Sequence, residues 1–364
     1  MNIVEREKLF HIDWALFLLI LAACMSGIFI VYSASGGDNE VVFKHSVRIG
    51  FGLIAMLTVA QFSPSFIKRH TTKLYLFAVL LLIAVLLIGV IGKGAQRWLD
   101  LGFMRLQPSE LMKLAMPLMV AWWVNKYPLP VRFNQVFVSL LIVMIPTALI
   151  MLQPDLGTAL LIASSGLIVI FLAGISWRLM LIALGLFAVV GPMFYYLVLH
   201  DYQRSRILTL FNPWQDPLGA GYHTIQSMIA IGSGGIVGKG WVGGTQSQLD
   251  FLPERHTDFI FSVFAEEFGF IGFLFLMALY LAIVFRGIYI AFSTRSVFAR
   301  LLSGSITLTF FFYVFVNIGM VAGILPVVGV PLPLFSYGGT SMVTLLIGFG
   351  MLMSVKSHRD IAAH

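Results

Sequence analysis

The chain has 364 residues, of which 59% are hydrophobic and only 11% are charged, with a mean hydropathy of +0.95 and a net charge of +7. Soluble domains carry roughly a quarter charged residues, so this composition excludes an ordinary soluble protein. No basic patch with interleaved aromatic residues occurs outside short loops, and nucleic-acid binding is therefore not expected.

Apolar runs of membrane-crossing length, about 17–25 residues each, recur along the whole chain. They lie at about 14–32, 46–62, 74–92, 108–124, 136–152, 156–173, 179–199, 259–285, 301–323 and 337–355. The runs are continuous and lack the alternation of a membrane β-barrel strand. We predict an all-α integral membrane protein, a single polytopic domain over residues 1–364 with about ten transmembrane helices.

The topology follows from the distribution of basic residues. The run after MNIVEREKLFHID has full membrane length and further spans follow it, so we expect it to remain as the first helix. With the N-terminus inside, the short inner segments hold most of the Lys and Arg residues and few acidic ones, which predicts that both termini are cytoplasmic. Cys24 is the only cysteine, so neither an internal disulfide nor a cysteine metal cluster is expected.

Residues 92–114, GKGAQRWLDLGFMRLQPSELMKL, lead into the fourth predicted helix on the outer side. Pro108 suits the first turn of a helix, where its missing N–H costs nothing. Glu110 and Lys113 share one helix face. Two interpretations stay open for this pair: a local ion pair at a helix start, or a functional group, since ionisable residues in membrane spans usually mark function.

Residues 152–161, LQPDLGTALL, repeat the Gln-Pro pattern at another outer helix start. Here Gln153 and Asp155 flank the proline. An aspartate near a helix N-terminus stabilises the helix dipole, so capping is the favoured role of Asp155 taken alone.

Residues 200–258 form one long segment that does not span, and we predict it to be a large extracytoplasmic loop before the eighth helix. A structureless loop of this length is unusual unless it is functional, although short surface helices with flexible turns also fit. Its glycine-rich part does not match a P-loop, because Ser233 and Gly240 stand at required glycine and Ser/Thr positions. A dinucleotide motif fails at Val237, so no nucleotide is expected.

The stretch FLPERHTDFIFSVFAEEFGF carries an unusual number of carboxylates for a membrane entrance. Asp258 lies where water meets the eighth helix, beside His256. Glu266 is about 12 Å deeper, and Glu267 points to the opposite side. We expect Glu267 to pair with an Arg or Lys, and Asp258 to act as a general base toward a hydroxyl.

Residues 323–341, GILPVVGVPLPLFSYGGTS, contain three prolines that break a regular helix. We favour a broken or re-entrant segment that lines a cavity over an ordinary proline-rich turn. Helices four, six, eight and ten also start on the outer face, where helix N-termini attract anions. The basic residues assigned to this face are Arg97, Arg105, Arg204, Arg206, Lys239 and Arg255. Together these features suit an anionic substrate and a proton acceptor.

Several phrases resemble one known family nearly end to end. They are RWLDLG, QPSELMKL, QPDLGTA, DPLGAGYHTIQSMIAIGSGG, GTQSQLDFLPERHTDFIFSVFAEEFG and PLPLFSYGGTS. The chain is similar to the SEDS proteins (shape, elongation, division and sporulation), which are polytopic peptidoglycan glycosyltransferases. Its short N-terminal tail resembles the elongation branch, RodA, more than the division branch, FtsW.

The resemblance implies polymerisation of lipid II, an undecaprenyl-pyrophosphate-linked disaccharide pentapeptide, on the outer face of the bacterial cytoplasmic (inner) membrane. It implies that Asp258 deprotonates the acceptor's GlcNAc 4-hydroxyl. That oxygen attacks the donor's MurNAc anomeric carbon, and undecaprenyl pyrophosphate leaves with inversion. Glu110 and Lys113 match a pair that tunes or positions the base. The substrate-binding candidates are Arg97, Gln153, Asp155, Arg204, Arg206, Lys239, His256 and Ser336.

The resemblance also implies partners. These are a class B penicillin-binding protein that crosslinks the new glycan, lipid II, membrane lipid and other elongation proteins. A divalent cation, Mg or Mn, is a candidate for neutralising the pyrophosphate.

Two rival functions are considered. A lipid II flippase would use intramembrane carboxylates and broken helices, but its site would lie near the midplane, whereas the ionisable residues here cluster at the outer face. A non-catalytic scaffold would leave Asp258 without a purpose and would tolerate Asp258→Asn.

Overall fold

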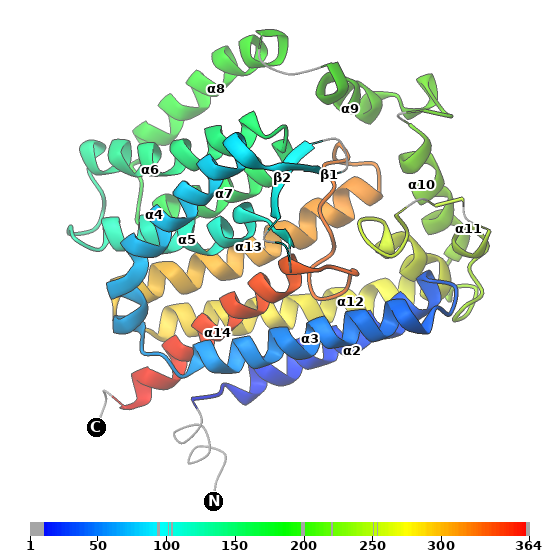
Figure 1. The fold of residues 1–364 in the computed structure, drawn as a ribbon, viewed down its shortest axis with the longest axis horizontal. Helices are drawn as coiled ribbons and strands as arrows, with labels where there is room; N and C mark the ends of the chain where they lie inside the picture. Colours follow the sequence, from blue (N-terminus) through cyan, green and yellow to red (C-terminus); the bar gives the residue numbers. More distant parts are fainter. Residues whose placement is uncertain are drawn as a thin grey trace, which may run out of the picture.

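The computed structural model describes residues 11–92, 95–100, 102, 105–197, 201–219, 221–249, 251–252 and 254–361. Within these ranges the chain forms a bundle of long helices with a few short elements at one end (Figure 1). The long helices are α2 (Trp14–Ala34), α3 (Asn39–Ala60), α4 (Pro64–Ile88), α5 (Pro108–Val124), α6 (Phe133–Leu152), α7 (Leu156–Leu172), α8 (Trp177–Leu197), α12 (Ile260–Ser293), α13 (Val297–Val321) and α14 (Thr340–Ile361).

Each of the ten predicted apolar runs corresponds to one of these helices, so the predicted helical architecture is confirmed for the described residues. Eight of the helices are long and apolar enough to cross a membrane. The bounds of the third run were wrong. Ser63 caps α4 and Pro64 occupies its first turn, so the helix begins well before residue 74 and ends at Ile88.

A small sheet follows α4 and was not expected from the sequence. Strands β1 (Val90–Gly92), β2 (Ala95–Asp100) and β3 (Arg105–Leu106) pair antiparallel in the order β1-β2-β3. The sheet sits between the end of α4 and the start of α5. It therefore carries Arg97, on β2, toward the start of α7, where Arg97 contacts Pro154 and Asp155.

The long segment before α12 contains short helices, as one of the two interpretations expected. They are α9 (Asp201–Phe211), the 3-10 helix η1 (Pro213–Gln215), α10 (Tyr222–Gly234) and α11 (Thr245–Gln248). Residues 200, 220, 250 and 253 of this predicted loop lie outside the described residues. The buried Ser227 of α10 donates a hydrogen bond to the carbonyl of Val321 at 2.7 Å, which fixes α10 to the end of α13.

Helix α12 is kinked at Gly269, where φ is +60° and ψ is −156°. The chain after α10 inserts at this kink. The N–H groups of Lys239 and Gly240 donate to the carbonyls of Glu266 and Glu267, each at 3.0 Å. A Cβ on Gly269 would lie 2.4 Å from the nitrogen of Gly238, so only glycine permits this approach.

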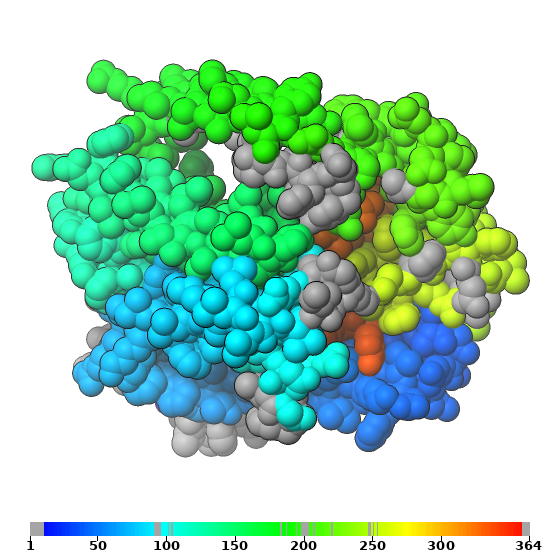
Figure 2. Space-filling model, turned by 45° about the horizontal axis from the view of Figure 1, so that its top comes forward, coloured from blue at the N-terminus to red at the C-terminus, as the bar shows by residue number. Residues whose placement is uncertain are grey.

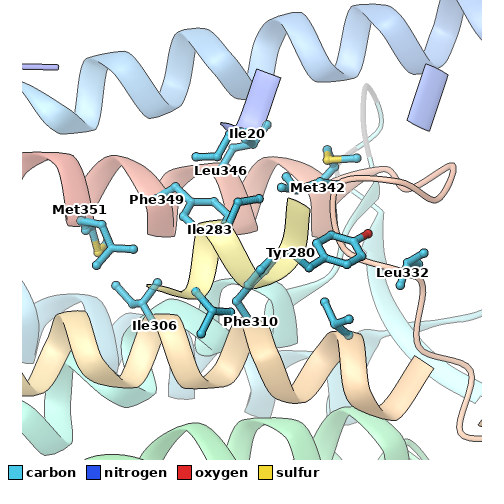
Figure 3. Packing of buried hydrophobic residues seen from close by; sticks show 14 of the residues in the cluster. Ile20, Tyr280, Ile283, Ile306, Phe310, Leu332, Met342, Leu346, Phe349 and Met351 are labelled. Atoms are coloured by element: carbon cyan, nitrogen blue, oxygen red, sulfur yellow. The ribbon is translucent and has the colours of Figure 1, made fainter. Parts of the chain in front are cut away.

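The hydrophobic core lies where α2, α12, α13 and α14 meet. Figure 3 shows Ile20, Phe310, Leu346 and Phe349 packed together from these helices. The hydroxyl of the buried Tyr280 donates to the carbonyl of Pro333 at 2.7 Å. The core therefore also holds the chain that connects α13 to α14.

The two ends of the described chain lie side by side. The rings of His11 and His358 stack with their centroids 4.4 Å apart, and Figure 1 shows both chain ends at the same side of the bundle. This agrees with both termini lying in one compartment; which side of the membrane they occupy stays a prediction.

Helix α8 stands apart from the rest of the bundle. Among the residues whose burial is described, none in its most apolar stretch is buried, and Leu181 and Leu184 are 57% and 65% exposed. Figure 2 shows a hollow between the green band of this helix and the body of the molecule. Most of the described apolar side chains of α8 are therefore exposed, whereas Leu179, near its start, packs against the core.

Candidate active site

Between the end of α13 at Val321 and the start of α14 at Thr340, the chain is not helical; we call residues 322–339 the broken segment. It appears orange in Figure 1, and some of its atoms are visible on the face of the molecule shown in Figure 2. The segment lines a cavity of about 80 Å³ together with residues of α5, α13 and α14. The prediction of a broken segment that lines a cavity is thus confirmed.

The cavity wall carries polar groups among its apolar side chains. Lys113 of α5 and Thr309 and Tyr313 of α13 all line it. In the part of the chain that the structure describes, the hydroxyl oxygens of Thr309 and Tyr313 are buried without a hydrogen-bond partner. Buried polar groups are normally satisfied, so these oxygens suit a ligand that brings its own polar atoms.

Asp258 lies half-buried in a turn before α12. A Cβ added to Gly329 of the broken segment would lie 3.4 Å from its Oδ2 atom. The side-chain amide of Asn317, in α13, donates to the carbonyl of Asp258 at 2.9 Å and to that of Val330 at 2.6 Å. One amide thus joins the backbone of the predicted base to the broken segment.

Two further contacts meet the same stretch of backbone. Arg206 of α9 donates from Nη1 to the carbonyl of Val327 at 3.1 Å. In the first turn of α7, a Cβ added to Gly157 would lie 2.6 Å from the carbonyl oxygen of Val328. Residues 327–330, which we call the valine strip, therefore contact α9, α7, the entrance of α12 and α13 one residue after another.

Glu110 and Lys113 form the ion pair that the sequence suggested, with Lys113 Nζ 2.7 Å from Glu110 Oε1. Both side chains are largely buried, with exposed fractions of 9% and 15%. The ammonium group also lies 5.6 Å from the ring centre of Tyr313. Of the two side chains, that of Lys113 lines the cavity, so the pair joins the start of α5 to the cavity wall.

Arg97 and Asp155 form a second pair. Arg97 Nη2 donates to the carbonyl of Pro154 at 2.9 Å, and its Nε lies 3.4 Å from Asp155 Oδ2. Asp155 also accepts from the N–H of Thr158 at 3.2 Å, which confirms the favoured capping role.

Gln153 and Ser336, two of the substrate-binding candidates, both form hydrogen bonds with backbone groups, and Ser336 also lines the cavity. Gln153 is 2% exposed and donates to the carbonyl of Leu82 at 3.1 Å. Ser336 is 1% exposed, and its Oγ accepts from the N–H of Leu332 at 2.7 Å. Both side chains thus hold backbone groups in place.

The acidic pair in α12 also differs from expectation. Lys239 Nζ lies 2.7 Å from Glu266 Oε1, which accepts from the N–H groups of Thr245 and Gln246 as well. Glu267 accepts a hydrogen bond from the hydroxyl of Ser33 in α2. The prediction that Glu267 pairs with an Arg or Lys is wrong. The loop inserted at the Gly269 kink places its lysine, Lys239, against Glu266 and not against Glu267. Lys239, a substrate-binding candidate, is held by the carboxylate of Glu266.

The remaining two candidates contact different parts of the molecule. Arg204 donates to the carbonyls of Tyr195 and Tyr196, at the end of α8, at 3.0 and 2.6 Å. His256 accepts at its carbonyl from the N–H of Tyr337, 2.8 Å away, and the two rings pack edge to face at 5.7 Å. The guanidinium carbon of Arg48 also lies over the Tyr337 ring, 4.7 Å from its centre. His256 therefore fixes the end of the broken segment beside Asp258.

Sequence reasoning missed Asn317 and Tyr337. Asn317 had a visible signal, since it is an amide within the apolar run VFVNIGM, and polar groups are costly in a membrane span. The whole arrangement offers a half-exposed carboxylate on a fixed backbone, next to a cavity with a lysine in its wall. It can accept a proton from a bound hydroxyl and place positive charge near an anion.

Comparison with known proteins identifies the family of this chain. A profile of the family described as "Cell cycle protein" (FtsW/RodA/SpoVE) matches residues 13–361. The peptidoglycan glycosyltransferase MrdB of Escherichia coli K12 is 50% identical over 351 residues, which cover 96% of this chain and 95% of MrdB.

Two solved structures share the fold. A chain from a peptidoglycan synthase complex, studied for its coordination of polymerization and crosslinking, has a TM-score of 0.83 at 36% identity and covers 96% and 98% of the two chains. The rod shape determining protein RodA of Thermus thermophilus has a TM-score of 0.72 at 30% identity, covering 96% and 97%. The chain is thus a multi-pass membrane protein that belongs to the FtsW/RodA/SpoVE family.

Proposed function

We propose that this protein is a peptidoglycan glycosyltransferase that polymerises lipid II and uses Asp258 as its general base. The observation that carries the proposal is the position of Asp258, half-buried in a turn next to Gly329 of the valine strip, whose Val330 lines the cavity. The 50% identity to MrdB over nearly the whole of both chains supports the reaction class.

The transfer is a single displacement. Asp258 takes the proton of the acceptor's GlcNAc 4-hydroxyl while that oxygen forms a bond to the donor's MurNAc anomeric carbon. The bond from this carbon to the pyrophosphate oxygen breaks, and its electron pair leaves with undecaprenyl pyrophosphate. The configuration at carbon inverts, and Asp258 then returns its proton to water. A positioned base of this kind typically contributes about 10²–10⁴ in rate.

The leaving pyrophosphate gathers negative charge in the transition state, and preorganised cations stabilise it. We assign this role to Lys113, in the cavity wall, and to Arg206, which contacts the valine strip. Glu110 holds the Lys113 ammonium in place but also offsets its charge. Arg206 is exposed and able to follow a substrate.

The divalent cation stays outside the mechanism. Among the described residues, no three His, Cys, Asp or Glu side chains are grouped to hold a metal ion. A Mg or Mn ion would thus have to be held mainly by the substrate's own phosphate oxygens. To test whether the reaction needs a divalent cation, polymerisation is measured with EDTA and again after Mg or Mn is added back. Asp258→Asn serves as the inactive reference.

We place the enzyme in the bacterial cytoplasmic membrane, with its site on the extracytoplasmic face and with a class B penicillin-binding protein as partner. The similarity to RodA and to a chain of a peptidoglycan synthase complex supports this role in lateral elongation. Complementation of strains that lack the elongation or the division polymerase separates the two branches. Restored rod shape is expected, and restored division alone would contradict the assignment.

The activity is tested with purified protein and labelled lipid II, alone and with the penicillin-binding protein, in the presence of penicillin. Wild type should give a ladder of muramidase-sensitive glycan, and Asp258→Asn should give none. Asp100→Asn is the matched control, because Asp100 forms a surface pair with Arg105 at 3.8 Å. Lipid II moved across vesicles without any ladder would instead support a flippase.

A further inference from the structure

We infer that Asn317 is the positioning residue that sets the Asp258 carboxylate against the valine strip. This inference rests on the proposed function of Asp258 as a base. Asn317 lies in α13 and is completely buried. Its side chain does not touch the substrate in this account, and it acts only through the backbone of its two neighbours.

The hydrogen bonds of Asn317 point to this role. The Nδ2 atom carries two hydrogens, and it donates to two carbonyls, those of Asp258 and Val330. The Oδ1 atom is buried without a hydrogen-bond partner in the structure. Burying an unpaired carbonyl oxygen costs free energy, so an apolar side chain would serve better if only packing mattered here.

Both segments joined by Asn317 lack regular secondary structure. Asp258 is in a turn before α12, and Val330 is in the broken segment. Neither is held by the backbone ladder of a helix or sheet, whereas Asn317 is part of a long, mostly buried helix. The amide therefore transmits the fixed position of α13 to both segments at once.

The strip lies next to the carboxylate, since a Cβ added to Gly329 would be 3.4 Å from Asp258 Oδ2. If the two bonds of Asn317 are lost, this spacing is free to open. Misplacing a reacting group by about 1 Å can cost about 100-fold in rate even when the change is remote from the chemistry. Substrate binding by the cavity and the basic residues should change far less.

The test compares Asn317→Leu, Asn317→Gln and Ser227→Ala with wild type. Leucine keeps the volume of Asn317 and removes both donors. Glutamine keeps the amide but places it one methylene further out, which retains part of the clamp. Ser227 is the matched control, because its buried hydroxyl also donates to a backbone carbonyl, that of Val321, at the start of the broken segment.

Polymerisation kinetics with labelled lipid II and the thermal unfolding midpoint are measured for each variant. We expect Asn317→Leu to lose about 100-fold in kcat with KM changed less than about threefold. Its unfolding midpoint should fall no further than that of Ser227→Ala. Asn317→Gln should recover part of the lost kcat, and Ser227→Ala should retain the wild-type value within about threefold.

Wild-type kcat in Asn317→Leu would overturn the inference, as would a loss of kcat in Ser227→Ala of the same size. A rise in KM with kcat unchanged would also overturn it, because it would mean lost binding. These outcomes leave the proposed function intact, since wild type still polymerises lipid II. No ladder from wild type would overturn the proposed function and this inference together.

Discussion

Asp258 and Glu266 belong to the same stretch of sequence but occupy opposite environments. Glu266 is completely buried, and one of its oxygens accepts from a lysine and from two backbone N–H groups. Asp258 is half-exposed, lies in a turn and faces a glycine of the valine strip. A buried carboxylate surrounded by protein donors holds the fold together. In the proposed mechanism Asp258 serves chemistry instead: Asn317 holds its backbone carbonyl, and its Oδ2 atom lies beside the valine strip.

The largest effect should come from Asp258→Asn, which keeps the shape of the side chain but cannot accept the proton. Polymerisation should fall by about 10²–10⁴. The unfolding midpoint in detergent should stay close to wild type, since the substitution leaves the backbone carbonyl that Asn317 holds. A large drop in stability without loss of turnover would mean that Asp258, like Glu266, holds the fold together and does not act in the chemistry.

Glu266→Ala should lower the free energy of unfolding by about 3 kcal/mol, because it strands Lys239 and two backbone N–H groups. Chemical unfolding of the purified protein measures it. Glu40→Ala is the matched control, since Glu40 pairs with Lys44 on an exposed helix surface, where water and salt screen the pair and its loss should change stability very little. Equal losses in the two variants would mean that burial of Glu266 contributes nothing.

Glu110→Gln and Lys113→Met should each lower kcat/KM by about tenfold, because each removes half of a pair at the cavity wall. The double variant should lose less than the product of the two. A coupling free energy of about 1–2 kcal/mol between them is expected from a double-mutant cycle. Fully additive losses would show that the two side chains act separately.

Gly329→Ala should destabilise the protein by about 1–2 kcal/mol, since φ is +72° at this position. It should also slow polymerisation several-fold, because the new Cβ would touch the Asp258 carboxylate. Gly102→Ala separates the two effects: φ is +83° there, and a Cβ would meet nothing within 4 Å. Equal turnover in the two variants would argue against a contact between the strip and the base.

The sequence was sufficient for the helices and for the break between α13 and α14. Continuous apolar runs require helical hydrogen bonding in a membrane, and three prolines within 323–341 prevent it locally. Asp258 was predicted for the same reason, as a carboxylate at a helix entrance. These inferences depend only on local chemistry, which the sequence contains.

The partners of side chains could not be predicted in the same way. A helical wheel gives the direction of Glu266 and Glu267, but the Gly269 kink and the loop inserted there decide which of them meets Lys239. Gln153 was expected at the site, yet its side chain is buried and donates to the carbonyl of Leu82, whereas Ser336 accepts from the N–H of Leu332 while lining the cavity. Asn317 was missed because its two acceptors are backbone carbonyls, which leave no trace in the sequence.

The central claim, that Asp258 acts in the chemical step, is tested most directly by measuring lipid II binding and a single round of transfer on the same Asp258→Asn sample. The account predicts binding within about threefold of wild type and no new glycosidic bond. Product formed at the wild-type rate would contradict it, and so would a loss of binding large enough to explain the missing product.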